Sequence, residues 1–153
     1  MGTPPEVEME ARTATPKHLS HVFDHLADRL SHEYATAGET ENKAKENLLM
    51  DLREGRGHAL MDGDETLAVI TWHDEGGIAN TSFAANEEFF TAKTVRFCKR
   101  HIKKIQKLCG NVPIRSMSQS DRPDVERWFA LIGFEKVEQH ENSATFELPS
   151  NRA

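Results

Sequence analysis

The chain has 153 residues, with 25 acidic and 19 basic side chains and a formal net charge of −6 at pH 7. This length favours a single domain, which we expect over residues 6–148 with flexible termini at 1–5 and 149–153. No apolar run approaches the roughly 20 residues that span a bilayer, and the acidic N-terminal segment does not resemble a signal peptide. These features predict a cytoplasmic protein without a membrane partner.

The two cysteines, Cys98 and Cys109, fall in a segment with helical periodicity. Their spacing corresponds to about 16 Å along a helix at 1.5 Å per residue. This distance is too long for a disulfide, so we expect two reduced thiols.

The N-terminal third predicts one strand and two helices. Apolar and charged residues alternate from Glu6 to Arg12, which is typical of a half-buried strand. Thr15-Pro16 is a helix start signal, and apolar residues at helical spacing extend this helix to Tyr34. A break at 38–41 precedes a second helix, which ends at Gly55.

Turn residues then separate short strands. The predicted strands are 58–61, 66–72 and 78–83, the last extending toward Phe90, with turns at Asp62-Gly63-Asp64 and Gly76-Gly77. A helix at 93–108 follows, with the apolar stripe Val95, Cys98, Ile102, Ile105 and Leu108. A strand at 114–117, a helix and two strands at 136–139 and 144–148 complete the chain.

The last helix has recognisable ends. Asp121 is positioned to cap it, Pro123 is tolerated in its first turn, and Gly133 ends it. The corner that follows, Leu131-Ile132-Gly133-Phe134, resembles that of the GNAT superfamily of acyl-CoA-dependent N-acyltransferases. The element order over Glu6–Leu148 matches the same family.

The resemblance implies an α/β (mixed α+β) GNAT fold with a central sheet of six to seven strands flanked by about four helices. It also implies a V-shaped cleft between the fourth and fifth strands, where 78–83 and 114–117 would splay apart. Another α+β topology stays open. The chain looks most like small phage-encoded GNAT-like proteins of T7-like phages, on the basis of the basic helix, the loop before it and Trp128-Phe129.

Two functions follow from this resemblance. The first is acetyl-CoA-dependent transfer to an unknown amine. The second is an inactive GNAT scaffold that binds a host enzyme or is packaged with the virion. A monomer or a homodimer fits either function.

In the family, a glycine-containing loop before a helix binds the CoA pyrophosphate, because helix N-termini donate amides to phosphate. The corresponding loop, residues 88–96, contains no glycine. Both weakened and lost CoA binding are compatible with this loop. The resemblance assigns cofactor binding to Thr91, Ala92, Lys93, Thr94, Val95, Arg96, Arg100 and Phe129.

The helix 93–108 carries seven basic residues in an acidic protein. They suit CoA phosphates or an acidic partner, or they form a solvated face without a ligand. Direct nucleic-acid binding is not expected, because no aromatic residues are interleaved for base stacking.

Catalysis requires a group that accepts the amine proton. By position in the family, Glu87 and Glu88 are candidates, and His73 is another. The family often places a tyrosine general acid where this chain has Phe129, so Ser118, Ser120 or water would have to reprotonate the thiolate.

Four histidines fall on one face of the first predicted helix: His18, His21, His25 and His32. An i, i+4 pair can chelate zinc, but no cysteine or carboxylate cluster completes four ligands. We therefore expect no metal. The family resemblance implies instead that His25, His32 and Tyr34 contact a substrate or a protein partner.

Overall fold

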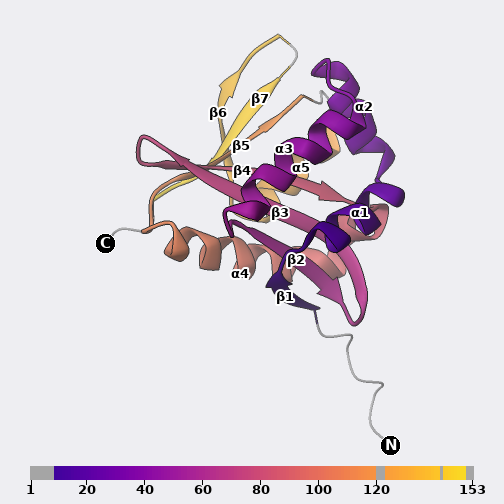
Figure 1. The fold of residues 1–153 in the computed structure, drawn as a ribbon. Helices are drawn as coiled ribbons and strands as arrows, with labels where there is room; N and C mark the ends of the chain where they lie inside the picture. Colours follow the sequence, from indigo (N-terminus) through magenta and orange to yellow (C-terminus); the bar gives the residue numbers. More distant parts are fainter. Residues whose placement is uncertain (1–8, 120–122, 142, 151–153) are drawn as a thin grey trace, which may run out of the picture.

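Seven strands form one mixed sheet at the centre of the fold (Figure 1). The computed structural model describes residues 9–119, 123–141 and 143–150, apart from the side chains of Ala92, Lys93 and Pro123. The strands are β1 (Met9–Thr13), β2 (Gly57–Asp62), β3 (Glu65–Glu75), β4 (Ile78–Ala85), β5 (Ile114–Ser118), β6 (Glu135–Gln139) and β7 (Ala144–Leu148). Their order in the sheet is β1-β2-β3-β4-β5-β7-β6. Only β4 and β5 pair in parallel among these neighbours.

Helices cover both faces of this sheet. They are α1 (Pro16–Asp24), α2 (Asp28–Thr36), α3 (Glu41–Arg53), the short 3₁₀ helix η1 (Glu87–Phe90), α4 (Ala92–Leu108) and α5 (Pro123–Leu131). Apolar residues of α1 and α3 pack with Val69 and Ala84 on one face. Those of α4 and α5 pack with Ala68 and Phe146 on the other face. No helix among the described residues has the length and apolarity to cross a bilayer.

The single helix predicted from Thr15 to Tyr34 is wrong, because the chain forms two helices there. The backbone of Ala27 is extended (φ −62°, ψ 139°), and its N–H donates to Ala85 O at 2.9 Å. No glycine or proline marks this break. The buried contact with the end of β4 outweighs the helical periodicity, so the described residues form five α-helices where about four were predicted.

The predicted extension of the 78–83 strand toward Phe90 is also wrong. The strand ends at Ala85, and Asn86 Oδ1 accepts from Phe89 N at 3.2 Å to cap η1. Residues 6–8 of the first predicted strand and the Asp121 cap lie outside the described residues. Gly133 adopts a left-handed φ of 103° and ends α5, as predicted.

The two central strands separate soon after they meet. The β4–β5 ladder contains only the pairs Ala79–Ile114 and Asn80–Arg115. One further bond joins Thr81 Oγ1 to Arg115 O at 3.2 Å. Beyond this point β5 pairs only with β7, so the predicted V-shaped divergence is confirmed.

Candidate functional site

Aromatic rings fill the opening that β4 and β5 leave between them. Phe83 of β4 stacks on Trp128 of α5 with ring centroids 5.7 Å apart, and Phe90 of η1 meets the same indole edge-on at 5.6 Å. A cavity of ≈ 30 Å³ lies among these rings and the α4 side of the sheet. This volume holds roughly two water molecules. The opening is therefore narrow in this state.

Helix α2 bridges the opening through Glu33. Its Oε1 accepts from Ser118 Oγ, at the end of β5, and from Gln119 N at 2.9 Å. Burial raises the pKa of the Glu33 carboxyl, and the bonds from Ser118 and Gln119 offset this only in part. No local pattern marks Glu33 as a site residue, because its position depends on the break at Ala27.

Arg29 lies one turn earlier on α2 and contacts η1 and α5 beside the same opening. Its guanidinium carbon is 4.1 Å from the centroid of the Phe90 ring. It also forms ion pairs with Glu87 (3.5 Å) and Asp124 (3.8 Å). Arg29 Nε and Trp128 Nε1 are buried without a hydrogen-bond partner among the described residues.

Arg29, Glu33 and Trp128 all line one small cavity of ≈ 10 Å³. Glu33 and two residues whose buried donors lack a partner among the described residues thus line one cavity where the central strands diverge. Perturbed ionisable groups of this kind are concentrated at functional sites.

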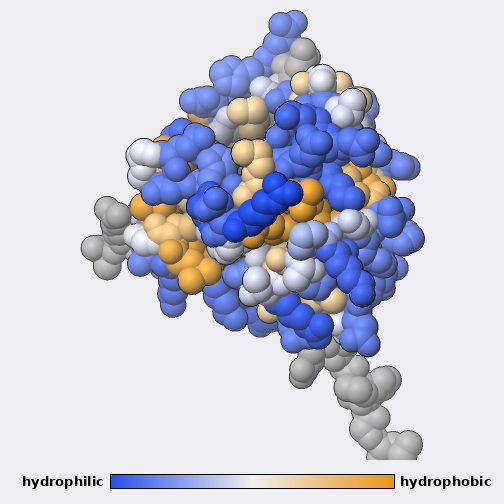
Figure 2. Space-filling model, in the orientation of Figure 1, coloured by the Kyte–Doolittle hydropathy of each residue, from blue (hydrophilic) through white to orange (hydrophobic). Residues whose placement is uncertain are grey.

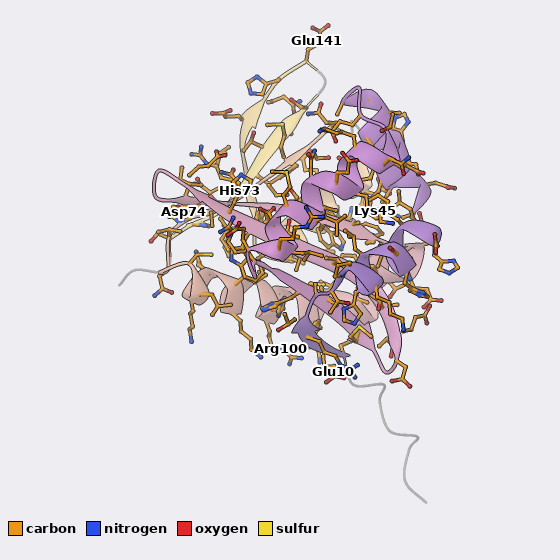
Figure 3. The ribbon with its side chains drawn as sticks, in the orientation of Figure 1. Glu10, Lys45, His73, Asp74, Arg100 and Glu141 are labelled. Atoms are coloured by element: carbon orange, nitrogen blue, oxygen red, sulfur yellow. The ribbon has the colours of Figure 1, made fainter. Side chains whose placement is uncertain are left out.

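A larger pocket of ≈ 530 Å³ lies on the α3 side of the sheet. Its lining includes Tyr34, Asp51, Arg56, His73 and Phe83. Figure 3 marks His73 on β3, and Figure 2 shows that mostly hydrophilic residues cover this face of the molecule. The volume falls in the range of about 300–1,000 Å³ that small-molecule sites occupy.

Asp51 lies near two basic side chains that also line this pocket. Asp51 is 3.8 Å from the guanidinium of Arg56 and 3.9 Å from His73 Nδ1. The Tyr34 hydroxyl donates to Phe83 O at 3.2 Å, and burial raises the pKa of this phenol. Phe83 lines both this pocket and the small cavity, so both spaces border the same residue of β4.

The residues assigned to cofactor binding gather at the start of α4. No side chain caps this helix, and the Thr91 hydroxyl donates to Glu88 O at 2.9 Å. The Thr94 hydroxyl faces inward and donates to Phe89 O and Thr91 O. Val95 is half-buried, whereas Arg96 is exposed. The side chains of Ala92 and Lys93 lie outside the described residues.

The basic face of α4 is exposed along the helix, where Figure 3 marks Arg100. Its described members are Arg96, Lys99, Arg100, Lys103, Lys104 and Lys107. None of them forms an ion pair within the described part of the chain. Charge at this face is available to a ligand.

The candidate catalytic residues occupy different surroundings. Glu87 and Glu88 are exposed on η1, while Ser118 contacts Glu33 inside the opening. Phe129 is buried, and its ring stacks on Phe146 with centroids 4.3 Å apart. The structure brings together Ser118 and Glu33, and it places His73 in the larger pocket.

The expected common face of four histidines is wrong, because the helix breaks between α1 and α2. His18 Nδ1 accepts from Thr15 N at 3.1 Å in a capping box. The rings of His21 and His25 meet edge-on with centroids 4.9 Å apart, and His32 lies on α2. No cluster of three or more metal-ligating side chains occurs among the described residues.

No protein-family model and no curated protein matches the sequence. Solved structures share the fold at low identity. The PaiA N-acetyltransferase of Thermoplasma acidophilum, in complex with coenzyme A, superposes with a TM-score of 0.71 at 14% identity, over 93% of this chain and 99% of that one. A GNAT-family acetyltransferase of Bacillus anthracis has a TM-score of 0.67 at 14% identity, covering 94% and 96%.

The ribosomal-protein-S5-alanine acetyltransferase of Vibrio fischeri gives a TM-score of 0.63 at 13% identity, over 97% of this chain and 96% of that one. These structures are similar to the chain along nearly its full length. The fold is therefore the mixed α/β fold of GNAT acetyltransferases, as predicted.

Proposed function

We propose that the chain is an acyl-CoA-dependent N-acyltransferase that transfers an acyl group, most simply acetyl, to an amine. The observation that carries this proposal is the divergence of β4 and β5 after two ladder pairs. It occurs in a fold shared with acetyltransferases, one of which holds coenzyme A. A thioester seated between the strands would be reachable from both faces of the sheet.

The proposed cofactor site is the N-terminal part of α4. A helix N-terminus favours anions, and the first turn of α4 lacks a side-chain cap. Arg96 and Arg100 are exposed there and supply positive charge, with Lys93 close by in sequence. The buried Thr94 hydroxyl supports the loop rather than the ligand, since it donates to two carbonyls before α4.

The acceptor amine is proposed to enter from the larger pocket beside His73. Phe83 lines both this pocket and the small cavity at the opening, and the amine would pass this residue to approach from the face opposite α4. Of the family-based candidates, Ser118 lies within the opening, and Glu87 reaches it through Arg29. Glu88 and His73 are farther from the described contacts of this opening.

Calorimetry tests the proposal directly. Purified protein is titrated with acetyl-CoA and with CoA at fixed ionic strength, and binding with one-to-one stoichiometry is expected. Turnover is then measured as thiol release from acetyl-CoA against a panel of small amines. Absence of measurable binding of either nucleotide would show that the fold has lost its cofactor.

A second candidate function is a catalytically inactive scaffold that binds a host protein. The observation that favours it is the narrow opening, where aromatic rings leave only ≈ 30 Å³ and ≈ 10 Å³ free. The phage-type origin, a host or virion partner and the oligomeric state stay predictions. Co-purification with a defined protein, without CoA binding, would favour this candidate.

A further inference from the structure

The small cavity at the opening brings together a buried carboxylate and two residues whose buried donors have no partner among the described residues. Glu33 is an ionisable group buried on α2, and Arg29 Nε and Trp128 Nε1 are buried donors without partners among the described residues. All three residues line the same ≈ 10 Å³. Buried polar groups are normally hydrogen-bonded, so unpaired donors beside a carboxylate indicate a place for an absent acceptor.

We propose that this cavity borders the acyl-transfer centre, where Glu33 accepts the proton of the attacking amine and Trp128 Nε1 and Arg29 Nε bind the thioester oxygen. The inference rests on the proposed N-acyltransferase function, because it assigns roles within that reaction. It replaces the exposed Glu87 and Glu88 with a buried group that contacts β5.

The chemical step balances within this site. The amine nitrogen attacks the carbonyl carbon, a C–N bond forms, and the carbonyl electrons move to the oxygen. One amine proton passes to the Glu33 carboxylate, directly or through the Ser118 hydroxyl. The C–S bond then breaks, and the CoA thiolate takes this proton, which leaves an amide and a free thiol.

Glu33 is suited to this role by its surroundings. Ser118 and Gln119 donate to the carboxylate, and Arg29 and His32 are nearby basic residues of its own helix. Arg29 is itself paired with Glu87 and Asp124, which reduces its effect on Glu33. Burial therefore dominates, and the resulting basicity is closer to neutral pH, where a general base is most effective.

Trp128 and Arg29 are suited to the thioester oxygen by their buried, unpartnered donors and by the size of the cavity that both residues line. The free volume of ≈ 10 Å³ matches about one water-sized group. Donors held in a closed site stabilise a developing oxyanion without reorganising, and loss of one donor typically costs about 10²–10³ in rate. Phe83 and Phe90 hold the indole in place by ring contacts.

Indole NMR tests the site without turnover. The protein has two tryptophans, so ¹⁵N-labelled protein gives two indole signals, which Trp72→Phe and Trp128→Phe assign. We expect acetyl-CoA to shift the Trp128 signal downfield, whereas CoA, which lacks the thioester oxygen, leaves it unshifted. The Trp72 signal is the internal control.

Kinetics with matched variants completes the test. Glu33→Gln should lower kcat by about 10²–10⁴ and abolish the acidic limb of the pH–rate profile, with unchanged acetyl-CoA affinity. Trp128→Phe should lower kcat by about 10²–10³. Two control variants should leave kcat and the pH–rate profile unchanged. They are Glu46→Gln, at an exposed position of α3, and Trp72→Phe.

The outcomes separate the two proposals. Acetyl-CoA binding with an unshifted Trp128 signal, or wild-type pH dependence in Glu33→Gln, would overturn this reaction centre and leave the acyltransferase function standing. Failure of the wild-type protein to bind acetyl-CoA would overturn both. If Glu33→Gln does not fold, Ser118→Ala tests the same base, because loss of the bond that lowers the pKa of Glu33 should move the acidic limb to higher pH. An unmoved acidic limb in Ser118→Ala would overturn the assignment.

Discussion

His58 Nδ1 on β2 and His101 Nε2 on α4 lie 3.1 Å apart inside the protein. The Trp72 ring meets His58 edge-on at 4.9 Å, and Phe97 stacks on His101 at 5.7 Å. Burial lowers the pKa of His101 to about 4 and also lowers the pKa of His58. The pair is therefore neutral at pH 7, with one imidazole donating to the other.

This pair predicts an acid-sensitive contribution to stability. Because the folded-state pKa of His101 lies below its unfolded value of about 6.5, its contribution is complete above pH 6.5 and is lost as the pH falls toward 4. The loss should reach on the order of 2–3 kcal/mol. Urea unfolding at pH 7, 5.5 and 4.5 measures it, and His101→Gln should flatten the decline.

His140→Gln is the control, because this histidine is exposed near the β6–β7 turn. It should retain the wild-type pH dependence. Equal slopes for wild type and His101→Gln would show that the buried pair does not govern acid stability.

Glu33 should affect stability with the opposite sign. Its folded-state pKa is raised, so its contribution is present below the unfolded value of about 4.3 and is lost as the pH rises through the folded-state value. Glu33→Gln should therefore be at least as stable as wild type at pH 8, with the difference shrinking near pH 5. Urea unfolding checks this, and a clear loss of stability at pH 8 would indicate a structural carboxylate.

Arg96 should contribute to CoA affinity if the first turns of α4 bind phosphate. A charge-assisted hydrogen bond is worth about 1.5–3 kcal/mol, so Arg96→Ala should weaken CoA binding by roughly tenfold or more. Lys107→Ala, at the other end of the same exposed face, is the matched control. Calorimetry at fixed ionic strength measures both, and equal affinities for the two variants would remove Arg96 from the site.

Phe129 should be important for stability because of its stacking on Phe146 in the core. Phe129→Ala should cost about 3–5 kcal/mol through lost burial and a cavity. Leu131→Ala, on an exposed position of the same helix, should change stability by less than about 0.5 kcal/mol. Chemical denaturation of both variants distinguishes the core position from the surface.

Local patterns in the sequence were sufficient for much of the fold. The apolar spacing of α4, the turn at Gly63 and the left-handed Gly133 depend on neighbouring residues, so their predictions hold in the structure. The divergence of β4 from β5 was predicted from the family resemblance. The apolar spacing of α4, the turn and the helix end follow from periodicity or backbone preference over a few residues.

Tertiary contacts decided the candidate site. The break before α2 depends on one hydrogen bond from Ala27 to Ala85, which no local signal reveals. That break turns α2 so that Glu33 reaches Ser118, 85 positions away in the chain. The sequence by itself determined most of the elements and their order, whereas burial between distant elements determined the break before α2 and which carboxylate lies at the opening.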